Sequence, residues 1–155
     1  MLRKICHRLG LLRQLRHPAD WLLFIRIFCF ALLAPWRMRR SLSTVARQFT
    51  PLLRSTPAAE QQVAVILAYT ELAIQVGRPL VQARCLTRGF TNYYFLRRAG
   101  VPVELHFGVS VCPTALLGHC WLVLQDVPFA EATDPRLHFR TVYALPNAAG
   151  AAQLP

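Results

Sequence analysis

Residues 118–131 read GHCWLVLQDVPFAE, and this stretch has the pattern of a β-hairpin. The apolar segment HCWLVL predicts one strand, QDVP predicts a turn, and a short returning strand is expected around Phe129 to Glu131. His119 opens this hairpin and Glu131 closes it, twelve residues later. The stretch therefore places an imidazole and a carboxylate at the open end of one small hairpin.

The preceding segment, RCLTRGFTNYYFLRRAGVPVELHFGV (residues 84–109), changes from a helical period to a strand period. A helix is expected to begin between Val81 and Cys85 and to end at Gly100, because glycine commonly follows the last residue of a helix. The alternating residues after it predict a strand that ends at Cys112. The buried stripe of the helix is expected to consist of Leu86, Phe90, Tyr93 and Tyr94.

Helical patterns dominate the first half of the chain. Helices are expected over residues 2–16, from Trp21 to Ala34 with Asp20 as cap and Pro35 as end, from Arg39 to Leu53, and from Thr56-Pro57 to a stop at Gly77. Helices first and strands later predict an α+β fold. We expect a basic helical N-terminal region (1–54), a domain that contains the strands (55–146) and an Ala-rich tail (147–155).

Charge and cysteine content narrow the class of protein. The formal net charge of the 155-residue chain is +11, and residues 1–54 carry eleven Lys or Arg against one acid, hence +10. An acidic peptide, an acidic partner protein or a phospholipid surface would suit this region, whereas no recognition motif for nucleic acid is present. The five cysteines form no CxxC pair, so neither a disulfide scaffold nor a metal site is expected, and no cofactor is implied.

The apolar run from Trp21 to Ala34 raises the question of a membrane segment. It has 14 residues and contains Arg26, whereas a spanning helix needs about 20 apolar residues. We therefore expect a buried or interfacial helix, with peripheral membrane contact left open. No small-residue cleavage site follows the run, and a cytoplasmic protein with reduced thiols is expected.

Cys85 is the candidate nucleophile. A thiol attacks a carbonyl only as the thiolate, and a helix N-terminus with nearby positive charge lowers its pKa. Cys85 lies in the first turn of its predicted helix, with Arg84 and Arg88 beside it. The alternative interpretation of this residue is a buried structural cysteine.

His119 is the candidate base, and a carboxylate would orient it. If the hairpin loop has three residues centred on Gln125, His119 faces Glu131 across the strands. A two-residue turn at Asp126-Val127 would instead pair His119 with Asp134. We rank this register second, because it puts Pro128 in a flanking pair of the hairpin, where proline has no N–H to donate.

The combined pattern resembles the stand-alone leader peptidases of lasso-peptide biosynthesis, which have a transglutaminase-like fold. In that family a Cys-Leu-x-Arg helix start, a basic helix end with glycine, a strand ending in Gly-Val and a His-(Ala/Cys)-Trp strand occur in this order. The matching positions are Cys85, Leu86, Arg88, Arg97, Arg98, Gly100, Gly108, Val109, His119, Cys120, Trp121 and Leu122.

The resemblance implies a papain- or transglutaminase-like Cys-His-acid site at Cys85, His119 and Glu131 in a cytoplasmic bacterial enzyme. Such an enzyme would cut the leader from a precursor peptide that a separate leader-binding protein delivers, before a lasso cyclase closes the ring. The sequence departs from the family in having Glu131 where aspartate is more familiar. Gln82 and the backbone N–H of Cys85 are candidates for stabilising the oxyanion.

Two other functions fit the same residues. Attack by an amine in place of water would make the chain a peptide acyl transferase that exchanges amides. A non-catalytic binding module of the same fold would keep the architecture without a reactive thiol.

Overall fold

The computed structural model describes residues 17–39, 41–53, 59–78, 80–81, 84–110 and 117–146. Several expectations lie outside these residues. They are the helix over 2–16, the helix start at Thr56-Pro57, the roles of Gln82 and Cys112, and the tail over 147–155.

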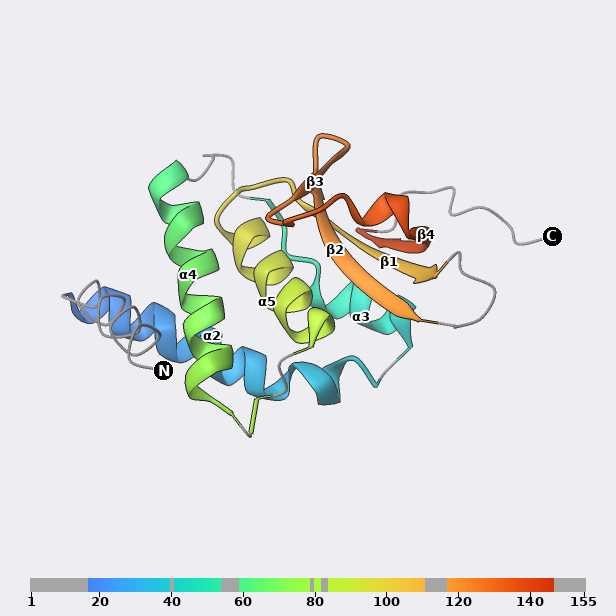
Figure 1. Ribbon diagram of the computed structural model, residues 1–155. Coiled ribbons are helices and arrows are strands. Elements are labelled where there is room, and N and C mark those ends of the chain that lie inside the picture. Colours follow the sequence, from blue (N-terminus) through green and yellow to red (C-terminus); the bar gives the residue numbers. More distant parts are fainter. Residues whose placement is uncertain are drawn as a thin grey trace, which may run out of the picture.

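The described residues form helices on one side of an antiparallel sheet, which confirms the α+β prediction (Figure 1). The sheet has four strands in the order β3-β2-β1-β4. The elements are α2 (Pro18–Arg37), α3 (Leu42–Phe49), α4 (Glu60–Val76), α5 (Cys85–Arg98), β1 (Glu104–Ser110), β2 (Gly118–Leu124), β3 (Val127–Phe129), the 3-10 turn η1 (Pro135–Leu137) and β4 (Phe139–Leu145).

Helix α5 is the central element of the fold, because it contacts α2 and α4 on one side and strands β1 and β2 on the other. Its limits agree with the sequence prediction: it begins at Cys85, and Gly100 follows its end with a φ of 94°, a backbone conformation that glycine adopts without strain. Arg97 fixes this end, since its buried guanidinium donates to the carbonyl of Val103 (3.1 Å) and to that of Pro51 (3.5 Å).

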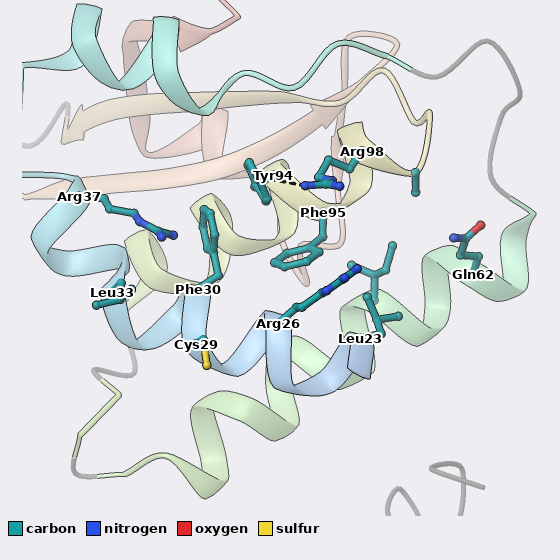
Figure 2. Close-up of a pocket in the computed structure, with 12 residues that line it drawn as sticks. Leu23, Arg26, Cys29, Phe30, Leu33, Arg37, Gln62, Tyr94, Phe95 and Arg98 are labelled. Carbon is teal, nitrogen blue, oxygen red and sulfur yellow. Dashed lines mark hydrogen bonds between the residues drawn. The ribbon is translucent and has the colours of Figure 1, made fainter. Parts of the chain in front are cut away.

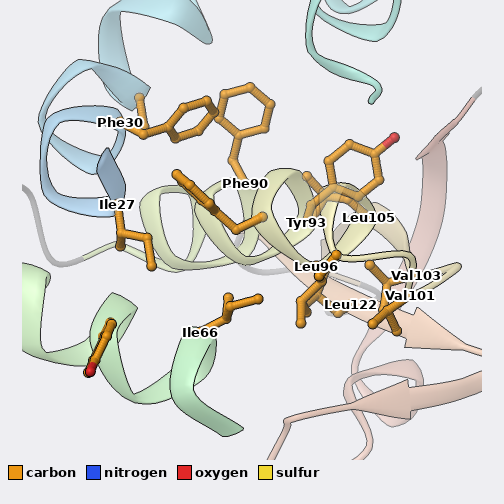
Figure 3. Close-up of a cluster of buried hydrophobic side chains, with 14 of the residues drawn as sticks. Ile27, Phe30, Ile66, Phe90, Tyr93, Leu96, Val101, Val103, Leu105 and Leu122 are labelled. Atoms are coloured by element: carbon orange, nitrogen blue, oxygen red, sulfur yellow. The ribbon is translucent and has the colours of Figure 1, made fainter. Parts of the chain in front are cut away.

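The core lies between α5, the other helices and the sheet (Figure 3). Phe90, Tyr93 and Leu96 of α5 are fully buried there, and Leu105 of β1 closes the cluster from the sheet side. The residues that α2 and α4 add to this cluster include Ile27, Phe30, Ala34, Ile66, Tyr69 and Leu72. The basic N-terminal helices therefore cover the same core that supports the strands.

The prolines of α2 do not have the effects that the sequence suggested. Pro18 occupies the first turn of the helix, where its missing N–H costs no hydrogen bond, and the Asp20 carboxylate accepts from the His17 N–H at 3.2 Å. Pro35 lies inside the last turn, and the helix continues to Arg37. The third helix is shorter than predicted, because Ser41 caps its start and Pro51 disfavours helical geometry at Thr50.

Helix α2 also has the length and composition of a membrane-spanning helix. Its inner face is part of the core, where Ile27, Ala31 and Ala34 are buried. Its outer face carries exposed apolar side chains, namely Trp21, Leu22, Ile25, Leu33 and Trp36. Peripheral membrane contact through this outer face stays a prediction.

The predicted register of the β2–β3 hairpin is wrong. Gln125 and Asp126 form a two-residue turn with φ values of 51° and 62°, and Leu122 pairs with Phe129. Two positive φ angles suit the right-handed twist of a tight hairpin, but glutamine is an unusual residue there, so the sequence favours a three-residue loop centred on Gln125 over this two-residue turn. Neither Glu131 nor Asp134 is a cross-strand partner of His119, since β3 ends at Phe129.

Strand β4 was not predicted from the sequence. It pairs with β1 at the edge of the sheet, and the register shifts between Phe107 and Gly108. Leu145 is its only buried residue, and its other positions are half-buried or exposed without regular alternation, so the strand lacks the pattern that identifies a half-buried strand.

Gly108 should be needed for the packing of Trp121. A Cβ atom at position 108 would lie 2.7 Å from two atoms of the buried indole and 3.0 Å from the Arg140 carbonyl oxygen. We predict that Gly108→Ala lowers the free energy of unfolding by about 1–3 kcal/mol, measured by chemical denaturation. Gly118→Ala is the matched control, because nothing lies within 4 Å of its added Cβ. Equal stability of the two variants would contradict the packing argument.

Candidate active site

A small pocket lies where the N-terminal end of α5 meets β2 and the residues after β3. Helix α5 supplies Cys85, Arg88, Gly89 and Asn92, β2 supplies His119, Cys120 and Leu122, and the end of the hairpin supplies Phe129, Ala130 and Glu131. The structure thus brings the predicted site residues Cys85, His119 and Glu131 together around one pocket.

Cys85 is the first residue of α5, and its side chain is half-buried. Hydrogen bonds from the side chain and backbone of Cys120 lower the pKa of the Cys85 thiol to about 5, against the opposing effect of burial. The nearby His119 lowers the pKa further, through a hydrogen bond and through its charge. The thiolate is therefore the stable form of Cys85 at neutral pH, as a cysteine nucleophile requires.

Cys120 is the neighbour of His119 on β2, and both residues lie within hydrogen-bonding reach of the Cys85 sulfur. Its side chain is buried, and the hydrogen bond to Cys85, together with burial, raises the pKa of the Cys120 thiol. Cys120 therefore stays a neutral donor beside the Cys85 thiolate. The sequence analysis gave this residue no role at the site.

His119 is held by aromatic neighbours. Its ring is stacked near Trp121 of the same strand, with centroids 6.0 Å apart, and lies 5.1 Å from the ring of Phe139 on β4. Its backbone is paired with Gly108. These contacts fix the imidazole at the start of β2, next to the Cys85 thiol.

Glu131 reaches the pocket by a route that the sequence did not indicate. Ala130 adopts a positive φ of 59°, which turns the chain just after β3 and before Glu131. Partial loss of hydration raises the pKa of the Glu131 carboxyl, while the charges of His119 and Arg88 act in the opposite direction. The carboxylate therefore interacts electrostatically with the imidazole without being its cross-strand partner.

Asp134, the second candidate for the acidic member, has a structural partner. Its carboxylate caps η1 by accepting from the Arg136 N–H at 2.9 Å, and it also accepts hydrogen bonds from the Arg136 guanidinium. This interaction with Arg136 lowers the pKa of Asp134. The geometry thus favours Glu131 over Asp134 as the partner of His119.

Comparison with known families agrees with this architecture. Residues 25–144 match the family model of the transglutaminase-like superfamily. The chain belongs to the transglutaminase-like superfamily. The predicted transglutaminase-like core with a helical N-terminal region is therefore confirmed, and the superfamily includes cysteine peptidases and acyltransferases. No curated protein and no solved structure shows a significant match to the chain.

Arg88 and Asn92 also line the pocket. The sequence indicates Arg88 only as a positive charge near Cys85, and it gives no role to Asn92. Both lie on the face of α5 that carries Cys85, because they follow it at helical spacing. Arg88 forms an ion pair with Glu71 of α4, which holds its positive charge beside the pocket. Asn92 is buried and lines the pocket, and its Oδ1 atom has no hydrogen-bond partner within the described structure. Helical spacing from Cys85 was the signal that could have identified it.

His106 lies on the same side of the sheet as His119 and has partners within the protein. Its ring is half-buried, with Nε2 2.9 Å from the Glu104 carboxylate and Nδ1 3.4 Å from the Thr141 hydroxyl. It faces Trp121 from the paired strand, with centroids 5.9 Å apart. His106 therefore supports the aromatic side of the sheet on which His119 lies.

The lowered pKa of Cys85 predicts which thiol of the protein is alkylated first. With iodoacetamide below one equivalent at about pH 6, we expect Cys85 to be alkylated first, because its thiol has a pKa of about 5. Peptide mapping by mass spectrometry measures the order of modification. Cys29 is the internal control, since it is exposed but lies outside the pocket. Preferential labelling of Cys29 would argue for the non-catalytic module.

Cys120 should act on Cys85 through its hydrogen bond. We predict that Cys120→Ala raises the pKa of Cys85, because it removes the largest cause of the lowered value and keeps the backbone N–H. The half-point of the pH dependence of Cys85 alkylation would move from about 5 toward higher pH. Cys29→Ala is the control and should leave that half-point unchanged. An unchanged half-point in Cys120→Ala would show that Cys120 does not lower the pKa of Cys85.

Proposed function

We propose that this chain is a cysteine peptidase that removes the leader from a ribosomally made precursor peptide during lasso-peptide maturation. The observation that carries the proposal is the Cys85 thiol, with a pKa of about 5, within hydrogen-bonding reach of His119 in a pocket that Glu131 also lines. The motif resemblance over residues 84–131 supports the substrate class.

The chemistry follows from the positions of three side chains. The Cys85 thiolate attacks the carbonyl at the leader–core junction, and the C–N bond breaks as protonated His119 gives its proton to the leaving amine. Water then attacks the thioester, His119 accepts a proton, and the thiolate leaves. Glu131 orients His119 and balances its charge. The backbone N–H of Cys85 is the candidate donor to the oxyanion.

The partners of this reaction are proposals too. A separate leader-binding protein would deliver the precursor, and a lasso cyclase would take the released core peptide. We place the reaction in the bacterial cytoplasm, where the thiols of Cys29, Cys85 and Cys120 stay reduced.

An assay with purified components tests the proposal. The protein is mixed with a leader-binding partner and a candidate precursor, and the released peptide is detected by its mass. We expect Cys85→Ala and His119→Ala to lower the rate by about a thousandfold or more, and Cys120→Ala, which keeps the thiol and the imidazole but raises the pKa of Cys85, to retain cleavage at a reduced rate. A cut that persists in Cys85→Ala would exclude the thiol mechanism.

The same assay separates Glu131 from Asp134. We expect Glu131→Ala to lower the rate by about ten- to a hundredfold, because the imidazole would lose its orienting charge. Asp134→Ala should leave the rate unchanged, since Asp134 binds Arg136. The reverse order would transfer the acidic role to Asp134. An amide product formed with an added amine would instead favour acyl transfer.

A further inference from the structure

A second and larger concave surface lies at the opposite end of α5 from Cys85 (Figure 2). One hollow of about 610 Å³ lies between α2, α4 and the last turns of α5, and a neighbouring hollow of about 580 Å³ extends toward Pro51 and Leu52. The two hollows share the side chains of Arg26, Tyr94 and Arg98, so we call them together the basic groove.

The charge of the basic groove is unbalanced. Arg26, Arg37 and Arg98 line it, and none of its other described lining residues carries a carboxylate. Among the described residues, the arginines that form ion pairs with carboxylates lie elsewhere, at Arg88 and Arg136. The Nη1 atom of Arg37 is buried and has no hydrogen-bond partner within the described part of the chain. Buried donors without partners are rare in folded proteins, and the described residues give this guanidinium ring contacts with Phe30 and Phe49 but no neutralising carboxylate.

Aromatic rings form the wall between these cations. Phe30 and Tyr94 are stacked with centroids 4.4 Å apart, and the Arg37 guanidinium lies 4.5 Å from the Phe30 centroid. Arg98 donates a hydrogen bond to the Tyr94 hydroxyl at 3.2 Å. Planar guanidinium groups held against rings in this way are arranged for bidentate contact with carboxylates.

The dimensions favour a peptide over a small anion. The two hollows are connected through shared residues, and they are also lined by the apolar side chains of Leu23, Leu33 and Leu52. They therefore offer contacts for both carboxylates and apolar side chains. Along α5, Cys85 and Arg98 are separated by about 20 Å, at about 1.5 Å per residue. An extended chain covers that distance with about six residues.

We propose that the basic groove binds an acidic segment of the peptide on which Cys85 acts. This inference rests on the proposed function for the identity of the peptide. Glutamate or aspartate side chains bind Arg26, Arg37 and Arg98, and an adjacent apolar or aromatic residue packs on the Phe30–Tyr94 wall. The groove holds the substrate at least about six residues from the bond that the thiolate attacks, because the distance along α5 is the shortest path between the two sites.

Binding is tested without catalysis, in the full chain carrying Cys85→Ala. The probe is a fluorescein-labelled twelve-residue peptide of alternating Glu and Leu with one central Phe, and its anisotropy is measured at moderate ionic strength. We expect Arg26→Gln/Arg98→Gln to weaken binding at least tenfold. The matched control is Arg78→Gln/Arg140→Gln, which removes two exposed charges outside the groove and should change affinity less than threefold.

The outcomes separate the two proposals. Equal loss in both double variants would show attraction to the net charge alone and would overturn the groove. The groove would also be overturned if a probe with Gln in place of every Glu bound as tightly as the acidic probe. Selective loss supports the groove even where no precursor is cut, and in that case only the peptidase proposal fails. Thermal unfolding of each variant shows whether the fold is retained. A further variant, Arg37→Lys, keeps the charge but not the planar guanidinium group, and it should also weaken binding.

Discussion

The close contact between α5 and β2 at Gly89 is the constraint on which the rest of the structure depends. A Cβ atom on Gly89 would lie 3.1 Å from the Leu105 side chain and 3.3 Å from the Cys120 sulfur. Glycine therefore allows the helix to approach the sheet closely, at a cost of about 1 kcal/mol in helix propensity. One turn earlier along α5, this approach places the Cys85 thiol beside Cys120 and His119.

The electrostatics of the molecule are divided along α5. At its N-terminal end, donors from β2 stabilise a thiolate, while at its C-terminal end Arg37 and Arg98 surround a groove whose described lining residues include no carboxylate. Under the two proposals above, the N-terminal end would act on a carbonyl of a substrate and the C-terminal end would hold an acidic segment of the same substrate. Helix α2 belongs to both arrangements, because Phe30 packs into the core and also lines the groove.

The sequence predicted the elements that have strong local signals. The start of α5 at Cys85 and its end before Gly100 followed from helix period and capping, and strands β1 and β2 followed from alternation. The sequence did not predict the features that depend on an unusual backbone conformation or on pairing between distant segments. Glutamine at a positive φ shifted the hairpin register, and Ala130 at a positive φ led Glu131 to the pocket by a different path. The edge strand β4 has a single buried residue, Leu145, which is too weak a pattern to reveal the strand.

The central claim is that Cys85 is a thiolate at neutral pH because β2 and the start of α5 stabilise it. Ultraviolet absorbance of thiolates, titrated against pH, tests this claim most directly. The account predicts one thiol that ionises with a pKa of about 5 in the native protein and is absent from Cys85→Ala. If every thiol ionised near its ordinary pKa of about 8.5, the account would be contradicted.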